Sequence, residues 1–316
     1  ERAPYETALS SKIVDVAKFE QLDLLHVHYA IPHAATAYMA KQILKTQGID
    51  LPYITTLHGT DITLVGKDPT YAPVVTFSIN QSDGVTAVSQ DLKDQTYNNF
   101  QITSNIEVIP NFVDLTRFRK AKKEHFKKAI APNGEKILIH TSNFRKVKRT
   151  QDVVLIFQKV HEQIPSKLLL VGDGPERQNL EILCRDLNLS EYVRFLGKQD
   201  PVEELLAVSD LFLMPSETES FGLAALEAMA CQVPVIASNA GGIPEIMIQG
   251  VTGFMSDVGD VDDMSSRAIS ILIDDQLHNQ FKIQALEHAK KYDLEKVLPK
   301  YEAFYEKVLQ DSTVVQ

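Results

Sequence analysis

Short apolar runs alternate with helical patterns along most of the chain. Four candidate strands fall in the first third, at Leu24–His28, Tyr53–Leu57, Gly84–Val88 and Ile106–Ile109. Six more follow, at Ile137–Thr141, Lys167–Val171, Tyr192–Leu196, Leu211–Met214, Val233–Ala237 and Gly253–Met255. Apolar residues at helical spacing occupy the intervals, as in Ala34–Leu44. This alternation predicts an α/β fold with parallel sheets.

The predicted elements fall into two groups, which a basic, polar stretch from Arg117 to Glu135 separates. We expect an N-terminal Rossmann-like domain at 1–115 and a C-terminal one at 116–290. A doubly wound unit has about six strands, so four strands predict an N-terminal domain that is truncated at its start. Segment 291–316 is predicted to be a helix that packs back on the N-terminal domain, with one apolar face: Leu298, Tyr301, Phe304, Tyr305 and Val308.

Composition narrows the class of protein. The 316 residues carry a net charge of −10, which argues against nucleic acid or an anionic membrane as the main partner. No run of eighteen apolar residues is present, and the first residues lack the apolar core of a signal peptide. Cys184 and Cys231 lie in apolar helical contexts without a C-x-x-C spacing. Buried thiols and a cytoplasmic location are therefore expected.

Two carboxylates, Glu219 and Glu227, stand at the ends of the segment Glu-Ser-Phe-Gly-Leu-Ala-Ala-Leu-Glu. Eight residues of helix rise span about 12 Å. Between the carboxylates lie Ser220 and the backbone N–H groups of Phe221, Gly222 and Leu223, which suit a phosphate anion if a helix starts there. The spacing matches a sugar, a diphosphate and a ribose, and so predicts a clamp for a nucleotide sugar. The same residues also fit a capping box, with Ser216 as the cap and Glu219 closing the helix start.

A basic loop, Ser142-Asn-Phe-Arg-Lys-Val-Lys-Arg149, follows one predicted strand and precedes a helix. The carboxyl end of a parallel strand is where ligands bind in such folds. Cationic side chains at that position could hold a diphosphate and stabilise its charge as it leaves. A solvated basic loop is the alternative.

Histidines mark the ends of two strands in the first domain. His58-Gly59 could bring an imidazole to a sugar hydroxyl or to an acceptor. His26, His28 and His33 form a second group, and His26 and His28 share a strand face. His-x-His can supply two zinc ligands, but no further ligands occur at a recognisable spacing, so no metal is expected. Tyr29 is the better candidate for an acceptor contact.

Three further motifs have structural alternatives. Gly172 and Gly174 permit close approach of a ligand, but Arg177 stands where a dinucleotide motif needs its last glycine. Pro175 is predicted to be the first residue of the following helix. The turn Ala240–Glu245 is either a packing turn or a cradle beside the clamp. Asp260-Val-Asp262 resembles a metal-binding Asp-x-Asp, although helix capping explains it better.

Together these residues resemble the retaining family-4 glycosyltransferases of the GT-B fold, over nearly the whole chain. The strongest strings are Ser220–Leu223 with Leu226–Ala230, and Gly241–Glu245. The resemblance implies two doubly wound Rossmann-like domains with a cleft between them. Four strings, His26–His33, Leu57–Ile62, Ser142–Arg149 and Phe195–Asp200, are similar to family members that transfer N-acetylglucosamine from UDP-GlcNAc to the hydroxyl of L-malate, the first step of bacillithiol biosynthesis.

The resemblance also implies roles for single residues. Glu219 would meet the hydroxyls of the donor sugar, Glu227 the ribose and Lys148 the diphosphate. Asn143 stands where the family has an arginine, and Arg145 is expected to substitute for it. His58 would lie near the transferred sugar, and Gly197 and Lys198 near the uracil. Tyr29 and Thr60 are the expected malate contacts. The glycine-rich acceptor loop of the family has no counterpart here, which puts the activity of this exact chain in doubt.

The mechanism implied is metal-independent transfer with retention, in which the acceptor hydroxyl passes its proton to the leaving diphosphate. Three alternatives stay open: transfer to another small molecule, a sugar or a lipid carrier; epimerisation of a UDP-sugar at C2; and binding of a nucleotide sugar without catalysis. A homo-oligomer is also left open.

Overall fold

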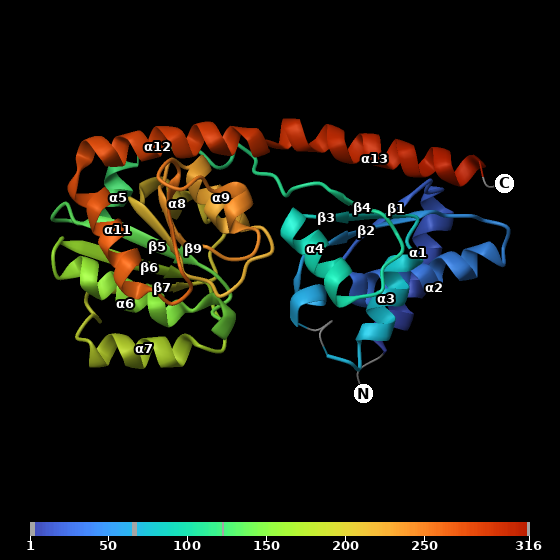
Figure 1. The fold of residues 1–316 in the computed structure, drawn as a ribbon, viewed down its shortest axis with the longest axis horizontal. Coiled ribbons are helices and arrows are strands. Elements are labelled where there is room, and N and C mark those ends of the chain that lie inside the picture. Colours follow the sequence, from blue (N-terminus) through green and yellow to red (C-terminus); the bar gives the residue numbers. More distant parts are fainter. Residues whose placement is uncertain (1–3, 65–67, 122, 315–316) are drawn as a thin grey trace. The chain divides into compact units, whose positions relative to one another are not determined.

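The computed structural model describes residues 4–64, 68–121 and 123–314. The chain divides into two compact units, and each has its own sheet (Figure 1). The N-terminal unit comprises Glu1–Asn111 and Glu295–Gln316, and the C-terminal unit comprises Phe112–Leu294. The boundaries between the units lie after Asn111 and after Leu294, where the sequence predicted boundaries after residues 115 and 290.

The N-terminal unit is built on four parallel strands in the order β1-β2-β3-β4. Its strands are β1 (Leu25–His28), β2 (Tyr53–Leu57), β3 (Gly84–Ala87) and β4 (Ile106–Val108). Its helices are α1 (Tyr5–Glu20), α2 (Ala35–Lys45), α3 (Ala72–Asn80), α4 (Gln90–Asn99) and α13 (Leu294–Val314), with short helical turns η1 (Ala30–Ala34) and η2 (Thr60–Leu64).

Helices cover both faces of this sheet. On one face Ile54 and Ile109 pack against Val297, Phe304 and Val308 of α13. On the other face Val27 and Tyr53 pack against Ala34 and Ala37. The predicted apolar stripe of the last helix is wrong at one position: Leu298 is 45% exposed, whereas Val297 is 1% exposed. Val297, Tyr301, Phe304 and Val308 follow the helical period more closely, and Leu298 lies one residue off this face.

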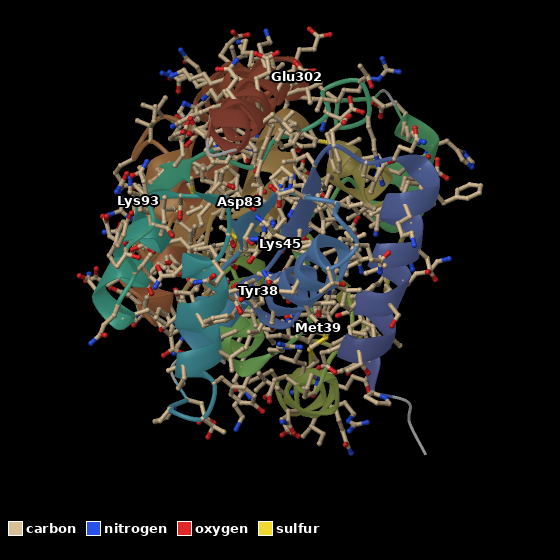
Figure 2. All side chains as sticks on the ribbon, turned by 90° about the vertical axis from the view of Figure 1, so that its right-hand side faces the viewer. Tyr38, Met39, Lys45, Asp83, Lys93 and Glu302 are labelled. Atoms are coloured by element: carbon tan, nitrogen blue, oxygen red, sulfur yellow. The ribbon has the colours of Figure 1, made fainter. Side chains whose placement is uncertain are left out.

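Polar contacts join the N-terminal helices to the sheet. The carboxylate of Asp83 accepts hydrogen bonds from the backbone N–H of Tyr53 at 2.8 Å and from Nζ of Lys41 at 2.7 Å. The rings of Tyr38 in α2 and Phe77 in α3 meet edge to face, with centroids 4.9 Å apart. Figure 2 views this unit with Tyr38 and Asp83 labelled. These contacts join α2 to the start of β2 and pack α3 against α2.

The C-terminal unit is a doubly wound sheet of six parallel strands in the order β10-β9-β8-β5-β6-β7. Its strands are β5 (Lys136–Thr141), β6 (Ser166–Val171), β7 (Val193–Gly197), β8 (Leu211–Met214), β9 (Val235–Ser238) and β10 (Gly253–Ser256). Its helices are α5 (Glu124–Ile130), α6 (Thr150–His161), α7 (Arg177–Asp186), α8 (Glu203–Val208), α9 (Leu223–Ala230), α10 (Ile243–Ile246), α11 (Val261–Ile273) and α12 (Asp275–Ala289), with turns η3 (Lys146–Lys148) and η4 (Lys290–Tyr292).

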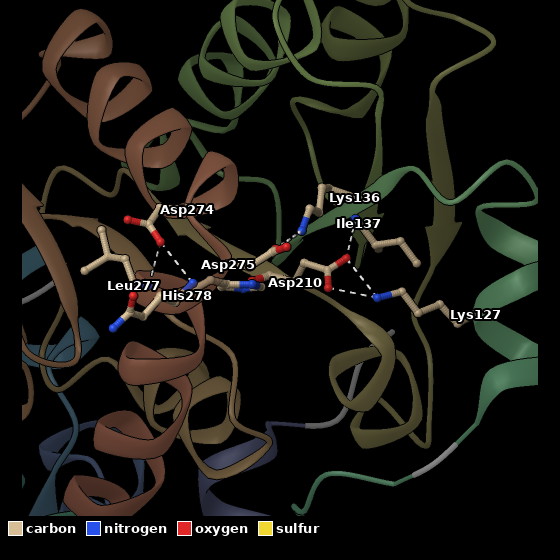
Figure 3. Close-up of polar contacts among 9 residues, drawn as sticks. Lys127, Lys136, Ile137, Asp210, Asp274, Asp275, Leu277 and His278 are labelled. Carbon is tan, nitrogen blue, oxygen red and sulfur yellow. Dashed lines mark hydrogen bonds and ion pairs between the residues drawn. The ribbon is translucent and has the colours of Figure 1, made fainter.

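The amino ends of the central strands are held by Asp210, which is 4% exposed (Figure 3). Its carboxylate accepts hydrogen bonds from Nζ of Lys127 at 2.8 Å and from the N–H of Ile137 at 2.9 Å. Nε2 of His278 donates to its carbonyl oxygen at 2.8 Å. This network stabilises the amino ends of the central strands. Ligands bind at the opposite, carboxyl ends in such folds, so the role of the network is structural.

All ten predicted strands are confirmed, and no end differs from its predicted position by more than two residues. Central strands such as β8 and β9 are buried throughout, as parallel strands covered on both faces should be. The start of α7 was predicted wrongly, because the helix begins at Arg177 and not at Pro175. Among the described residues, no helix is long and apolar enough to cross a membrane.

Candidate functional site

The loop after β5 is oriented by a buried histidine. His140 donates from Nδ1 to the carbonyl oxygen of Leu213 at 2.8 Å, so its Nε2 must accept, and the hydroxyl of Ser142 donates to it at 2.8 Å. The Ser142 oxygen accepts in turn from the N–H of Phe144 at 3.2 Å. Burial lowers the pKa of His140 to about 4, which keeps the ring neutral and this chain of bonds intact.

Lys148 and Glu219 form an ion pair at the carboxyl edge of the C-terminal sheet. Nζ of Lys148 lies 2.7 Å from Oε1 of Glu219, and the side chains are only 23% and 13% exposed. Ser216 donates its hydroxyl to the same carboxylate oxygen at 2.7 Å. The N–H of Glu217 donates to the carbonyl of Val147 at 2.8 Å. The basic loop and Glu219, which are far apart in the sequence, are therefore neighbours in the structure.

The segment that carries Glu219 rests on the turn after β9. The N–H of Gly242 donates to the carbonyl of Glu219 at 2.8 Å. A Cβ on Gly241, where φ is +58°, would lie 2.1 Å from that carbonyl oxygen. Side chains are excluded at such a distance, so the two glycines serve packing. This packing supports the packing-turn alternative, and it places the turn beside the segment that carries Glu219.

Helix α9 begins at Leu223, with Gly222 as its cap at a φ of +91°. The capping-box alternative is therefore wrong, because the helix starts four residues after Glu219 and the Ser216 hydroxyl bonds to a carboxylate rather than to a backbone N–H. Within the described chain, the N–H groups of Phe221, Gly222 and Leu223 have no hydrogen-bond partner. Free N–H groups at a helix start form an anion site.

Glu227 lies in α9, in a partly buried and charged setting. Burial raises the pKa of its carboxyl to about 7; the nearby Arg117 opposes this shift and Glu203 adds to it. Arg117 forms ion pairs with Glu203 and Asp200, both at 3.0 Å. Sequence reasoning missed this neighbourhood because residues 117, 203 and 227 share no motif. The only hint in the sequence was the position of Arg117 at the start of the basic stretch.

The remaining predicted donor residues differ in setting. A Cβ on Gly172 would lie 1.8 Å from the carbonyl oxygen of Ser142, so this glycine has a packing reason of its own. The N–H of Gly172 donates to the carbonyl of Gly197 at 2.7 Å, which joins the ends of β6 and β7. Three predicted residues are exposed: Asn143, Arg145 and Lys198. In the described parts of the chain, Arg145 has no ion pair, unlike Lys148.

In the N-terminal unit, the predicted acceptor residues come together at the carboxyl ends of β1 and β2. Nδ1 of His28 lies 2.8 Å from Nε2 of His58. The ring of Tyr29 is 5.1 Å from that of His58, measured between centroids. Tyr29 has a φ of +76°, a strained value for an aromatic residue. Thr60, the other predicted malate contact, is exposed two residues after His58.

Asp61 holds these two strand ends together, a role that the sequence analysis did not identify. Its carboxylate accepts from the N–H of Ala30 at 2.5 Å and from the N–H of Gly59 at 3.2 Å. Burial raises the pKa of Asp61 to about 6, against the opposing effect of these N–H groups. The position of Asp61 directly after the His-Gly-Thr string was the available signal.

His26 has a structural role. Its Nδ1 contacts the hydroxyl of Tyr305 at 2.7 Å, and its Nε2 contacts the Thr56 hydroxyl at 2.7 Å. Within the described residues, no group of three His, Cys, Asp or Glu side chains could hold a metal ion. The Asp-x-Asp motif caps a helix, as predicted: Asp260 accepts from the N–H of Asp263 at 2.9 Å at the start of α11. Cys184 and Cys231 are buried and free, also as predicted.

Two protein families match this chain. Residues 121–288 match the family described as Glycosyl transferases group 1, and residues 1–117 match Glycosyltransferase Family 4. N-acetyl-alpha-D-glucosaminyl L-malate synthase of Bacillus anthracis is 48% identical over 310 residues, which cover 98% of this chain and 81% of that protein. An uncharacterized glycosyltransferase of Methanocaldococcus jannaschii is 26% identical and covers 93% of this chain and 78% of that protein.

Solved structures share the architecture. Anabaena HepE in complex with UDP-glucose matches with a TM-score of 0.82 at 22% identity, covering 94% of this chain and 82% of HepE. Sucrose-phosphate synthase of Thermosynechococcus elongatus matches with a TM-score of 0.79 at 21% identity, covering 98% of this chain and 81% of that one. The predicted GT-B fold, with two parallel-sheet Rossmann-like domains, is thus confirmed.

Proposed function

This chain belongs to the group 1, family-4 glycosyltransferases, and on that premise we propose that it transfers N-acetylglucosamine from UDP-GlcNAc to the hydroxyl of L-malate. The reaction would open bacillithiol biosynthesis. The 48% identity to a synthase of that name supports the choice of donor and acceptor. The observation that carries the chemistry is the convergence of Lys148, Glu219 and the start of α9 at one sheet edge.

On the donor side, Lys148 and the N–H groups of Phe221, Gly222 and Leu223 would bind the diphosphate. Glu219 would accept hydrogen bonds from hydroxyls of the sugar. Glu227, about one turn into α9, would accept from the ribose, a role that suits a carboxylate held partly apart from bulk water. Arg145, which has no ion pair among the described side chains, is free to replace the arginine that the family has at Asn143.

On the acceptor side, His58, Tyr29 and Thr60 would contact L-malate or the transferred sugar. Their segments are fixed by Asp61, which bonds to the backbone on both sides. A site that must orient a small flexible molecule gains from such a rigid frame. On the donor side, Gly172 and Gly197 would shape the loops that follow β6 and β7, next to the bound UDP. Lys198, directly after Gly197, would lie near the uracil.

The proposed chemistry proceeds with retention. The bond from the anomeric carbon to the diphosphate breaks while a bond to the malate oxygen forms on the same face. The proton of the malate hydroxyl passes to an oxygen of the leaving diphosphate. Lys148, Arg145 and the amino end of α9 would stabilise the charge that develops on this group. Because fixed cations supply this stabilisation, we propose that the enzyme needs no metal.

An acceptor panel tests the assignment. Full-length protein is incubated with UDP-GlcNAc and EDTA, and with L-malate, simple sugars or a lipid carrier in turn, and released UDP is measured. We expect release with L-malate alone. Release with a sugar or lipid only would overturn the acceptor, and 2-epimerised donor without acceptor would indicate an epimerase. Tight UDP binding without turnover would indicate a binding protein.

The two free, buried thiols support a reducing, cytoplasmic location.

A further inference from the structure

The rings of His28 and His58 form a pair at the carboxyl edge of the N-terminal sheet. His28 is the last residue of β1, and His58 directly follows β2. Nδ1 of His28 and Nε2 of His58 are 2.8 Å apart, and the ring centroids are 5.0 Å apart. This distance is that of a hydrogen bond between two imidazoles. One ring nitrogen must therefore donate and the other must accept.

The backbone around the pair is held at several points. His33 donates from Nδ1 to the carbonyl of His28 at 2.6 Å. The N–H of Tyr29 donates to the carbonyl of Thr56 at 2.9 Å, which extends the β1–β2 ladder past His28. Asp61 ties the segment after His28 to the segment after His58. The two rings therefore have little freedom to separate.

The number of protons on the two rings decides which of the outer nitrogens can donate a hydrogen bond and which can accept one. Two neutral imidazoles carry two N–H protons on four nitrogens. One proton lies between the rings, so the other lies on one of the two outer nitrogens, Nε2 of His28 or Nδ1 of His58. Within the described parts of the chain, neither outer nitrogen has a hydrogen-bond partner. One outer nitrogen is thus a donor and the other an acceptor. The two roles exchange only when the inner proton crosses to the other ring and the outer proton moves to the opposite outer nitrogen, so that both rings stay neutral.

Both rings are held neutral. Burial, and then the neighbouring His28, lower the pKa of His58 to about 4. Burial, and then His33, lower the pKa of His28. At neutral pH the pair therefore keeps two protons, which is the condition for opposite outer roles.

We propose that His28 is a positioning residue for His58, and that the pair recognises a small hydroxy acid as one unit. The outer N–H would donate to a carboxylate. The outer bare nitrogen would accept from the hydroxyl that is to be glycosylated while the acceptor is being oriented, and the hydroxyl proton would then turn to the leaving diphosphate as the new bond forms. His28 fixes the orientation of the His58 ring and couples its tautomer to the ligand. This inference rests on the proposed function, since it assigns the acceptor end of that reaction.

Two substitutions of His28 separate its two roles. The side-chain amide of His28→Asn can replace Nδ1 as the partner of His58 but offers nothing at the position of Nε2. His28→Ala removes both. His125→Ala, an exposed histidine of α5 in the other unit, is the matched control. Melting temperatures by circular dichroism establish that each variant folds.

Steady-state kinetics of the full-length protein give the first readout. Loss of one or two ligand-directed hydrogen bonds corresponds to roughly 10- to 100-fold in kcat/KM. For L-malate we expect a fall of about 100-fold in His28→Ala and about 10-fold in His28→Asn, with the KM for UDP-GlcNAc within about twofold of wild type. A kcat/KM for L-malate within about twofold of wild type in His28→Ala overturns the proposal.

The tautomer of His58 gives a second readout that does not need turnover. Nitrogen-15 NMR of the imidazole distinguishes Nδ1–H from Nε2–H. We expect the tautomer populations of His58 to change in His28→Ala, and to return toward wild type in His28→Asn. Unchanged populations in His28→Ala overturn the pairing even if the enzyme is active. If wild-type protein shows no turnover with L-malate, the proposed function fails, while the NMR result still decides whether His28 positions His58.

Discussion

Nζ of Lys148 lies 2.7 Å from Oε1 of Glu219, in a pair whose side chains are mostly shielded from water. The two residues come from loops after different strands of one sheet, and Ser216 bonds to the same carboxylate oxygen. In our account a donor takes over both partners, since the diphosphate binds Lys148 and the sugar hydroxyls bind Glu219. The ion pair holds each group near its ligand position before the donor arrives.

Replacement of Lys148 tests its role toward the diphosphate. Lys148→Ala is expected to lower kcat by about 100- to 1,000-fold, because a fixed donor to the leaving group is lost. The KM for L-malate should change little. Lys159→Ala is the matched control, since Lys159 forms an exposed ion pair with Asp262 in the same unit. Initial rates of UDP release are the measurement, and equal rates for the two variants would contradict the assignment.

The raised pKa of Glu227 predicts that the free energy of unfolding depends on pH. Its pKa in the folded protein, about 7, exceeds the ordinary 4.5. The folded state therefore binds this proton more tightly than the unfolded state, and the free energy of unfolding falls as pH rises from 4.5 through 7. Glu227→Gln removes this dependence. At pH 8 the variant should be more stable than wild type by up to about 3 kcal/mol, and near pH 4.5 this advantage should vanish.

Urea denaturation of wild type and Glu227→Gln at pH 5 and pH 8 measures this difference. The same variant should bind UDP more weakly at pH 8, because the ribose loses an ionised acceptor. A stability difference that does not change with pH would show that the Glu227 carboxyl is not buried. Unchanged UDP affinity would separate Glu227 from the ribose.

Asp210 predicts a large structural effect far from the site residues. Asp210→Ala leaves the N–H of Ile137 and the ammonium of Lys127 without their acceptor. Leaving the buried N–H of Ile137 without its acceptor costs about 1–3 kcal/mol, and Lys127, which is 36% exposed, adds little because water can solvate its ammonium. Burial raises the pKa of Asp210, but the charge of Lys127 and its hydrogen bonds outweigh this and leave it lowered. The contribution to stability is therefore present above pH 3.8 and is lost as pH falls through the lowered pKa.

The control for Asp210 is Asp262→Ala, whose carboxylate is 84% exposed in its ion pair with Lys159. We expect less than about 0.5 kcal/mol for this exposed pair. Urea denaturation at pH 7 gives both values. Equal losses for Asp210→Ala and Asp262→Ala would mean that the amino-end network adds nothing to stability.

The close packing of Gly241 on the Glu219 segment predicts that a side chain at position 241 weakens donor binding. In Gly241→Ala the new methyl would meet the Glu219 carbonyl oxygen, so the Glu219 segment must move. Gly134→Ala is matched for backbone strain, with a φ of +82° and no atom within 4 Å of the new Cβ. Gly134→Ala should cost about 1 kcal/mol, and Gly241→Ala should cost more and also weaken UDP binding. Equal costs with unchanged binding would contradict the packing role.

The sequence predicted much of this fold because its signals were local. Apolar runs such as Tyr53–Leu57 and Leu211–Met214 need only their own residues to be identified as strands, and both bounds were correct. Contacts between distant segments were not predictable in this way. Nothing in the order of residues shows that Arg117 meets Glu203, or that Asp61 bonds to Ala30, because tertiary packing decides both. The capping box failed for a related reason: its pattern matched, but the Ser216 hydroxyl found a carboxylate instead of a backbone N–H.

The measurement that tests the central claim most directly is proton NMR of the product formed by full-length protein from UDP-GlcNAc and L-malate in EDTA. We predict one new glycoside of L-malate, equimolar with UDP, whose anomeric proton shows the small coupling of an α-linkage. That result would demonstrate the donor, the acceptor, retention and independence from metal together. A β-linked product, or no glycoside of malate beside an intact donor, would contradict the account.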